Sequence, residues 1–114
     1  MKSYQVRFAE EALADLARIF SDLLPVAGEP IARDFVGRLE GACLKLATFP
    51  ERGSLRDEIR PGLRIIGYRR QASIAFVVTD AEVLILRVLR RGADTEALLA
   101  EGADPSDEET DFIG

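Results

Sequence analysis

Histidine is absent from this 114-residue chain, and cysteine occurs only once, as Cys43. Without histidine a Cys–His zinc site cannot form, and acid–base catalysis near neutral pH lacks its commonest side chain. A lone cysteine excludes an internal disulfide and suits a reducing compartment. Gly53 and Gly62 are too far apart to form a glycine-rich phosphate loop. We therefore expect no metal site, no cofactor and no conventional catalytic set.

Long apolar runs are missing as well. No stretch approaches the roughly 18 apolar residues of a membrane-spanning helix. The first residues lead directly into alternating sequence, without the apolar core of a signal peptide. The length suits one domain, and a hydrophobic content of 47% suits a modest core. The expectation is a single soluble domain in the cytoplasm.

Basic residues are lacking from the C-terminal end. The first 93 residues carry all 15 Lys and Arg and 12 acids, whereas the remainder carries eight acids and no base. We expect a folded domain over residues 1–101 and an acidic, disordered tail over 102–114, by composition. The tail is either a free solvated end or a segment that docks transiently on a basic face.

Hydrophobic periodicity predicts the elements. Alternation over residues 2–8 is typical of a strand, and three- and four-residue spacing from Glu10 predicts a helix ended by Pro25. A second helix begins near Pro30, has Asp34 and Arg38 paired on its surface, and ends at Pro50, with Cys43 on its apolar stripe. Further strands are expected over 63–68, 72–79 and 82–89, and a short helix over 94–100.

This order, strand–helix–helix–strand–strand–strand, predicts an α+β fold. We expect an antiparallel sheet with a helical hairpin packed on one face. If the chain reverses direction at each successive element, the first strand should be antiparallel to the second and fourth strands.

One face of the predicted sheet would remain uncovered and apolar. Ordinary solvated sheet faces are mostly polar, and apolar patches rimmed by charge usually mark interaction surfaces. The alternative is that the tail or a second copy covers this face. The residues assigned to it, as candidates for binding a protein partner, are Ile66, Tyr68, Val83, Ile85 and Leu89.

Arginine dominates the second half of the domain. Seven arginines lie between positions 60 and 91, against only Asp80 and Glu82. Arginine suits bidentate recognition of phosphate or carboxylate, so nucleic acid and an acidic protein both remain possible partners. The candidates for contacting a cellular target are Arg64, Arg87, Arg90 and Arg91.

Several fragments, in order, resemble a known family. They are Tyr4-x-Val6-x-Phe8, Glu11-Ala12-x-x-Asp15-Leu16, Ala32-x-x-Phe35-Val36-x-x-Leu39, Leu46-x-x-Phe49-Pro50-Glu51-Arg52-Gly53, the run 56–64, and Ile85-Leu86-Arg87-Val88-Leu89 followed by Arg91-Gly92-x-Asp94. Together they resemble toxins of the RelE/ParE superfamily, most closely the ParE branch, over positions 4 to 100.

The resemblance implies a toxin of a type II toxin–antitoxin system in the bacterial cytoplasm. It would form a hetero-oligomer with a ParD-like antitoxin, serve plasmid stabilisation and cause growth arrest by inhibiting DNA gyrase. RelE-like relatives instead cleave mRNA on the ribosome, and an inactive relative that only binds its antitoxin is a third possibility. Many relatives carry histidine where this chain has Arg90, and no tyrosine or histidine follows Tyr68. These departures favour a toxin that is not an enzyme.

Overall fold

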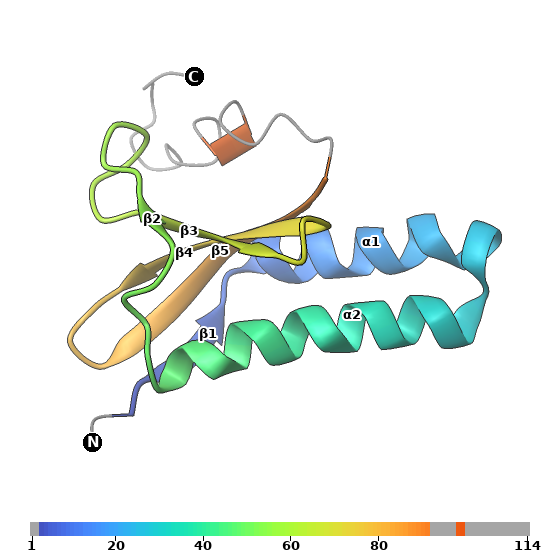
Figure 1. Ribbon diagram of the computed structural model, residues 1–114, viewed down its shortest axis with the longest axis horizontal. Coiled ribbons are helices and arrows are strands. Elements are labelled where there is room, and N and C mark those ends of the chain that lie inside the picture. The colour runs from blue at the N-terminus through green and yellow to red at the C-terminus, as the bar shows by residue number, and fades with distance from the viewer. Residues whose placement is uncertain (1–2, 92–97, 100–114) are drawn as a thin grey trace.

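The computed structural model describes residues 3–91 and 98–99 (Figure 1). Two long helices lie side by side along one face of a twisted sheet. The elements are β1 (Gln5–Phe8), α1 (Glu10–Ala27), α2 (Glu29–Leu44), a 3₁₀ turn η1 (Lys45–Ala47), β2 (Ser54–Leu55), β3 (Arg64–Tyr68), β4 (Ala72–Val78) and β5 (Glu82–Arg90). The predicted α+β class, with a helical hairpin on one sheet face, is confirmed.

The helices follow their apolar spacing. Ala9 precedes α1 without a side-chain cap, and Glu10 and Glu11 suit the positive end of the helix dipole. The prediction that Pro25 ends this helix is wrong, because α1 continues to Ala27 with the proline inside its last turn. Gly28, with φ of 89°, then turns the chain directly into α2.

The sheet has the order β1-β5-β4-β3-β2. Strands β2 to β5 are antiparallel to their neighbours, but β1 pairs in parallel with β5. The predicted antiparallel orientation of the first strand relative to the last is therefore wrong. Its cause is β2, a two-residue strand inside the segment expected to be a loop, which adds one reversal before β3.

Each face of the sheet carries its own apolar cluster. On the helix side, Leu16 and Leu39 pack with Phe76, Val83 and Ile85. On the opposite side, the cluster consists of Ile59, Leu63, Ala75, Leu89 and Leu99, with Ile65, Val77, Leu86 and Leu98 against it. The second face is thus covered in part by the loop before β3 and by Leu98 and Leu99.

A β-bulge in β5 breaks the alternation between these faces. Ala75 pairs with Arg87 while Phe76 pairs with Ile85, so Leu86 is an extra residue in β5. Val83, Ile85 and Val88 consequently share the helix side although the spacing between them is uneven. Within the described part of the chain, no helix has the length and apolar character needed to cross a membrane.

Candidate interaction surfaces

The apolar residues proposed to bind a partner are mostly core residues. Val83 and Ile85 are fully buried beneath the helices, and Ile66 and Tyr68 pack against the same cluster. Leu89 does lie on the opposite face, but it is only 6% exposed. The prediction that these residues lie on an uncovered face is therefore wrong for Ile66, Tyr68, Val83 and Ile85. The reason is that alternation groups residues by face without saying which face the helices cover.

Most of the exposed large apolar side chains lie instead on the helical hairpin. Leu13 on α1 is 52% exposed, and Val26 and Ile31, at the closed end of the hairpin, are 79% and 60% exposed. Val26 and Ile31 flank the turn between the helices, whereas Leu13 lies at the opposite end of α1. Apolar side chains this accessible on two neighbouring helices are typical of a protein-binding surface.

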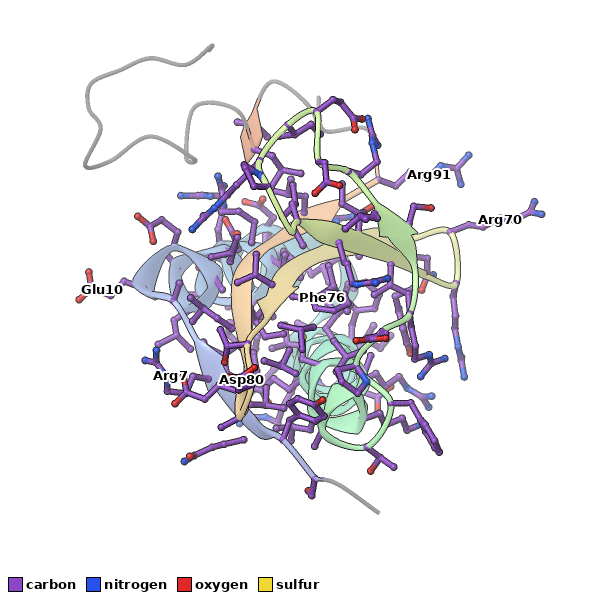
Figure 2. All side chains as sticks on the ribbon, turned by 90° about the vertical axis from the view of Figure 1, so that its left-hand side faces the viewer. Arg7, Glu10, Arg70, Phe76, Asp80 and Arg91 are labelled. Carbon is purple, nitrogen blue, oxygen red and sulfur yellow. The ribbon has the colours of Figure 1, made fainter. Side chains whose placement is uncertain are left out.

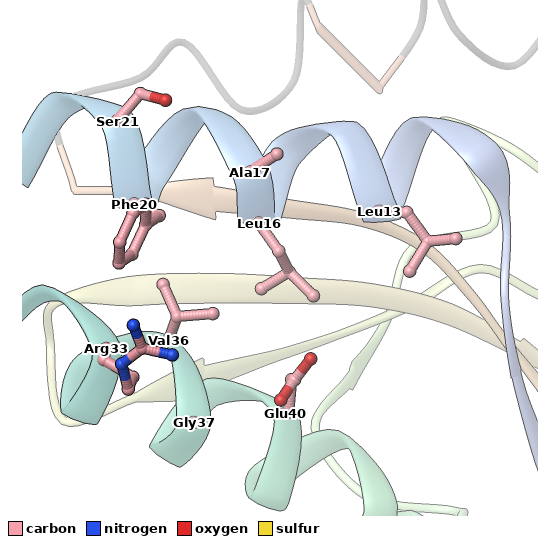
Figure 3. A pocket seen from close by; sticks show the side chains of 9 residues that line it. All are labelled: Leu13, Leu16, Ala17, Phe20, Ser21, Arg33, Val36, Gly37 and Glu40. Carbon is pink, nitrogen blue, oxygen red and sulfur yellow. The ribbon is translucent and has the colours of Figure 1, made fainter.

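A groove between α1 and α2 contains Leu13 (Figure 3). Leu16 and Phe20 point from α1 toward Val36 of α2, and Arg33 and Glu40 lie on either side of Val36 along α2. The groove encloses about 560 Å³. Small residues keep it open: Ala17 on α1 and Gly37 on α2 line it. An apolar groove with charged side chains at its margins is suited to the apolar face of an amphipathic helix. We call it the helix groove.

Arg87 is held by a buried carboxylate. Asp15 of α1 is 3% exposed and accepts hydrogen bonds from Nε and Nη2 of Arg87, at 2.7 and 2.9 Å. The same carboxylate accepts the backbone N–H of Val88 at 2.8 Å, and Arg18 approaches it at 3.5 Å. This arrangement ties α1 to β5 just after the bulge. Arg87 therefore serves the fold and is not freely available to a target.

The other arginine candidates are divided between the two ends of the sheet. Arg90 and Arg91 are exposed at the end of β5, where the Arg91 N–H donates to the carbonyl of Gln71 at 2.8 Å. Arg64 begins β3, and its Nη1 donates to the carbonyl of Arg52 at 3.5 Å. Arg64 pairs with Phe76, whereas Arg90 pairs with Ala72, four residues or roughly 13 Å along β4. The predicted four-arginine site is thus reduced to the Arg90–Arg91 pair.

The turn between β3 and β4 adds two arginines that were not among the candidates. Arg69 and Arg70 occupy the turn, close to Gln71 and so to the Arg90–Arg91 pair. Arg70 and Arg91 project outward on the same side of the molecule (Figure 2). A sequence signal did exist, since two arginines fill a break of hairpin length where asparagine and glycine are usual. We call Arg69, Arg70, Arg90 and Arg91 together the arginine cluster.

A second groove runs beside this turn, between α2 and β3. It encloses about 390 Å³, and its basic lining residues are Arg38, Lys45, Arg52 and Arg69. Arg38 pairs with Asp34 at 2.8 Å, as predicted. Asp34 and, to a lesser degree, Tyr68 raise the pKa of the Arg38 guanidinium. We call this the basic groove.

The single thiol is unreactive by its position. Cys43 is fully buried on the inner side of α2, as predicted. Burial raises its pKa to about 12, because the thiolate loses its hydration, and Glu40 adds to this effect. Over residues 3–91 and 98–99, no three His, Cys, Asp or Glu side chains are grouped to hold a metal ion. The acidic tail lies outside the described residues, and so does the predicted helix apart from Leu98 and Leu99, which are helical.

Known proteins match this chain in sequence and in structure. A family model described as the ParE toxin of the type II toxin–antitoxin system parDE matches residues 6–95. Toxin ParE3 of Caulobacter vibrioides is 32% identical over 75 residues, which are 66% of this chain and 74% of that protein. A solved structure titled as the chromosomal ParDE TA system from P. aeruginosa has a TM-score of 0.69 at 26% identity. That match covers 78% of this chain and 97% of the other.

Proposed function

We propose, from the premise that this chain belongs to the ParE toxin family of type II toxin–antitoxin systems, that a cognate ParD-like antitoxin neutralises it and that it acts by inhibiting DNA gyrase. The observation that carries the proposal is the family match, which spans residues 6–95 and so includes both helices and all of the sheet except Gln5. The toxin would act in the bacterial cytoplasm, cause growth arrest and stabilise the replicon that encodes it.

The helix groove is the proposed antitoxin site. An antitoxin segment that folds as an amphipathic helix would cover Leu13 and Phe20 and place its polar side toward Arg33 and Glu40. Burying a large apolar side chain is worth about 1.5–3 kcal/mol, so a few such contacts could sustain a stable complex. This surface replaces the sheet-face site suggested by the sequence alone.

Gyrase is favoured over mRNA as the target because residues 3–91 and 98–99 do not bring together the groups for metal-free RNA cleavage. Such cleavage needs a base for the 2′-hydroxyl and an acid for the leaving oxygen. The chain has no histidine, and its only tyrosines are Tyr4 and Tyr68. Tyr68 packs edge-on against Phe35 with ring centroids 6.4 Å apart, and Arg87 is bound to Asp15. Tyr68 is thus packed on the helix side of the sheet, and Arg87 is already engaged by a carboxylate.

Expression in growing bacteria tests this proposal. The chain should be induced alone and together with the small protein encoded beside it. We expect growth arrest with a DNA-damage response and intact mRNA when it is induced alone, and normal growth when both are present. Codon-specific cuts in ribosome-bound mRNA would instead support the nuclease alternative. Unimpaired growth when the chain is induced alone, at a level comparable to that of its partner in the co-expression, would support the alternative of an inactive relative.

A further inference from the structure

We infer that the arginine cluster and the basic groove form one continuous surface that binds the phosphodiester backbone of a nucleic acid. The inference concerns the described part of the chain alone and does not depend on the proposed gyrase target. It assigns to this end of the molecule a ligand that neither the antitoxin proposal nor the family match supplies.

The first observation is the strained turn. Arg69 and Arg70 have φ angles of 48° and 59°, and the N–H of Gln71 donates to the carbonyl of Tyr68 at 2.8 Å. Consecutive left-handed residues at the centre of a β-turn in a hairpin are usually Asn-Gly or Asp-Gly, because a longer side chain is disfavoured in that conformation. Turn geometry therefore gives no reason for arginine at either position. Backbone strain at an exposed tip is often linked to function, and here Arg70 projects outward while Arg69 lies over the Tyr68 ring (Figure 2).

The second observation is the lack of neutralising charge. Within residues 3–91 and 98–99, none of the four arginines of the cluster forms an ion pair with a carboxylate. Two acids on the adjoining part of α2 form ion pairs with other residues: Glu29 pairs with Arg33, and Asp34 pairs with Arg38. Four neighbouring unpaired cations repel one another, and an anionic ligand would relieve that repulsion.

The third observation is continuity. Arg69 belongs to the turn and also lines the basic groove, where Lys45 and Arg52 have no carboxylate partner in the described part of the chain. The Arg69 guanidinium lies 5.5 Å from the centre of the Tyr68 ring, which positions it at the mouth of the groove. Cations thus extend from the end of β5, across the turn, and along α2.

This pattern favours a phosphodiester chain over an acidic peptide. A nucleic-acid backbone presents regularly spaced charges of one sign, and arginine binds phosphate oxygens with two parallel hydrogen bonds. Acidic peptides usually combine their charges with apolar anchors. The basic groove offers Ala42, Ile66, Tyr68 and Ile74 for this purpose, and a pocket beside Arg90 and Arg91 offers Leu23, Ile31 and Phe35. An acidic peptide that carries apolar side chains is therefore the competing ligand, whereas the run of cations alone matches a phosphodiester chain. The net charge of −5 opposes binding at long range, so we expect weak, salt-sensitive binding by this surface.

The test measures the fluorescence anisotropy of a labelled 20-base-pair duplex DNA and of a labelled 20-nucleotide RNA, titrated with the full chain over a range of salt. The test variant is Arg69→Asn/Arg70→Gly, which installs the usual turn residues. The control is Arg7→Ala/Arg33→Ala, which removes the same charge from cations that are already paired. Neither gyrase nor antitoxin is present, so failure here is distinguishable from failure of the proposed function.

We expect the wild-type chain to bind at least one probe with a Kd on the order of 10⁻⁵ M at 0.1 M salt. The turn variant should bind at least fivefold more weakly, with a shallower salt dependence and a melting temperature no lower than wild type. The control should stay within twofold of wild type. Preference between the two probes identifies DNA or RNA as the source of the phosphates. No binding to either probe at low salt, or an equal loss of affinity in both variants, would overturn the inference. Tighter binding of a labelled polyglutamate than of either probe, in the same titration, would also overturn it.

Discussion

Replacing Asp15 with alanine should cost more stability than any surface charge change in this chain. Its carboxylate is 3% exposed and accepts hydrogen bonds from two Arg87 nitrogens and from the Val88 N–H. The Asp15→Ala variant removes the buried carboxylate that accepts two hydrogen bonds from the Arg87 guanidinium, whose side chain is only 16% exposed. It also leaves the Val88 N–H, in a buried part of β5, without an acceptor.

The magnitude follows from these contacts. Removing one partner of a buried, hydrogen-bonded ion pair costs about 3–5 kcal/mol. Alanine has a higher helix propensity than aspartate in the middle of α1, and this offsets about 0.5 kcal/mol of the lost stability. The net loss is therefore about 3 kcal/mol or somewhat more. With a urea m-value near 1.2 kcal/mol/M, typical of a domain this small, the unfolding midpoint should fall by roughly 2–3 M.

Urea unfolding followed by circular dichroism measures this loss. The matched control is Asp34→Ala, which breaks the exposed Asp34–Arg38 pair on α2 and should cost no more than about 0.5 kcal/mol. An apolar replacement of both partners, Asp15→Leu/Arg87→Met, should be less damaging than Asp15→Ala alone. A loss below about 1 kcal/mol for Asp15→Ala, or an equal loss in the control, would refute the reasoning.

Three further predictions test other parts of the account. Leu13→Glu, in the exposed helix groove, should weaken antitoxin binding by roughly 30- to 100-fold without lowering the melting temperature, and unchanged affinity would remove the groove as the docking site. Because burial disfavours the Cys43 thiolate and raises its pKa to about 12, the native chain should resist iodoacetamide at pH 8 and react only when unfolded; rapid native labelling would contradict this. Gly53→Ala should destabilise by about 2 kcal/mol or more, since φ is 77° and a Cβ would collide with a β3 carbonyl. Gly62→Ala should cost about 1 kcal/mol, because φ is 80° but no atom lies within 4 Å of the added Cβ. Equal losses of stability for the two variants in urea unfolding would contradict the collision at Gly53.

Local patterns in the sequence were sufficient for both helices and for four of the five strands. The helical spacing from Glu10, the surface pair Asp34–Arg38 and the buried place of Cys43 all depend on residues three or four apart, and all are confirmed. Strand boundaries were also close, since alternation is itself local. The short β2 escaped detection because Ser54 and Leu55 are exposed and too few to show a period.

The faces of the sheet required information that alternation does not contain. Period two groups Val83 with Ile85, but only the packing of α1 and α2 decides that both lie under the helices. The bulge at Leu86 then shifts the remainder of β5 by one residue, so Val88 joins them. The role of Arg87 depends on Asp15, 72 positions away in the chain, and no sequence spacing connects those two residues.

The gyrase proposal is tested most directly by a supercoiling assay with purified components. Relaxed plasmid, gyrase and ATP should be combined with increasing amounts of the chain, with and without an equimolar amount of its antitoxin. Our account predicts that supercoiling declines as the chain is added, that cleaved plasmid or unprocessed relaxed plasmid accumulates, and that the antitoxin restores activity. Full supercoiling at every concentration of a folded chain that binds its antitoxin would contradict the account.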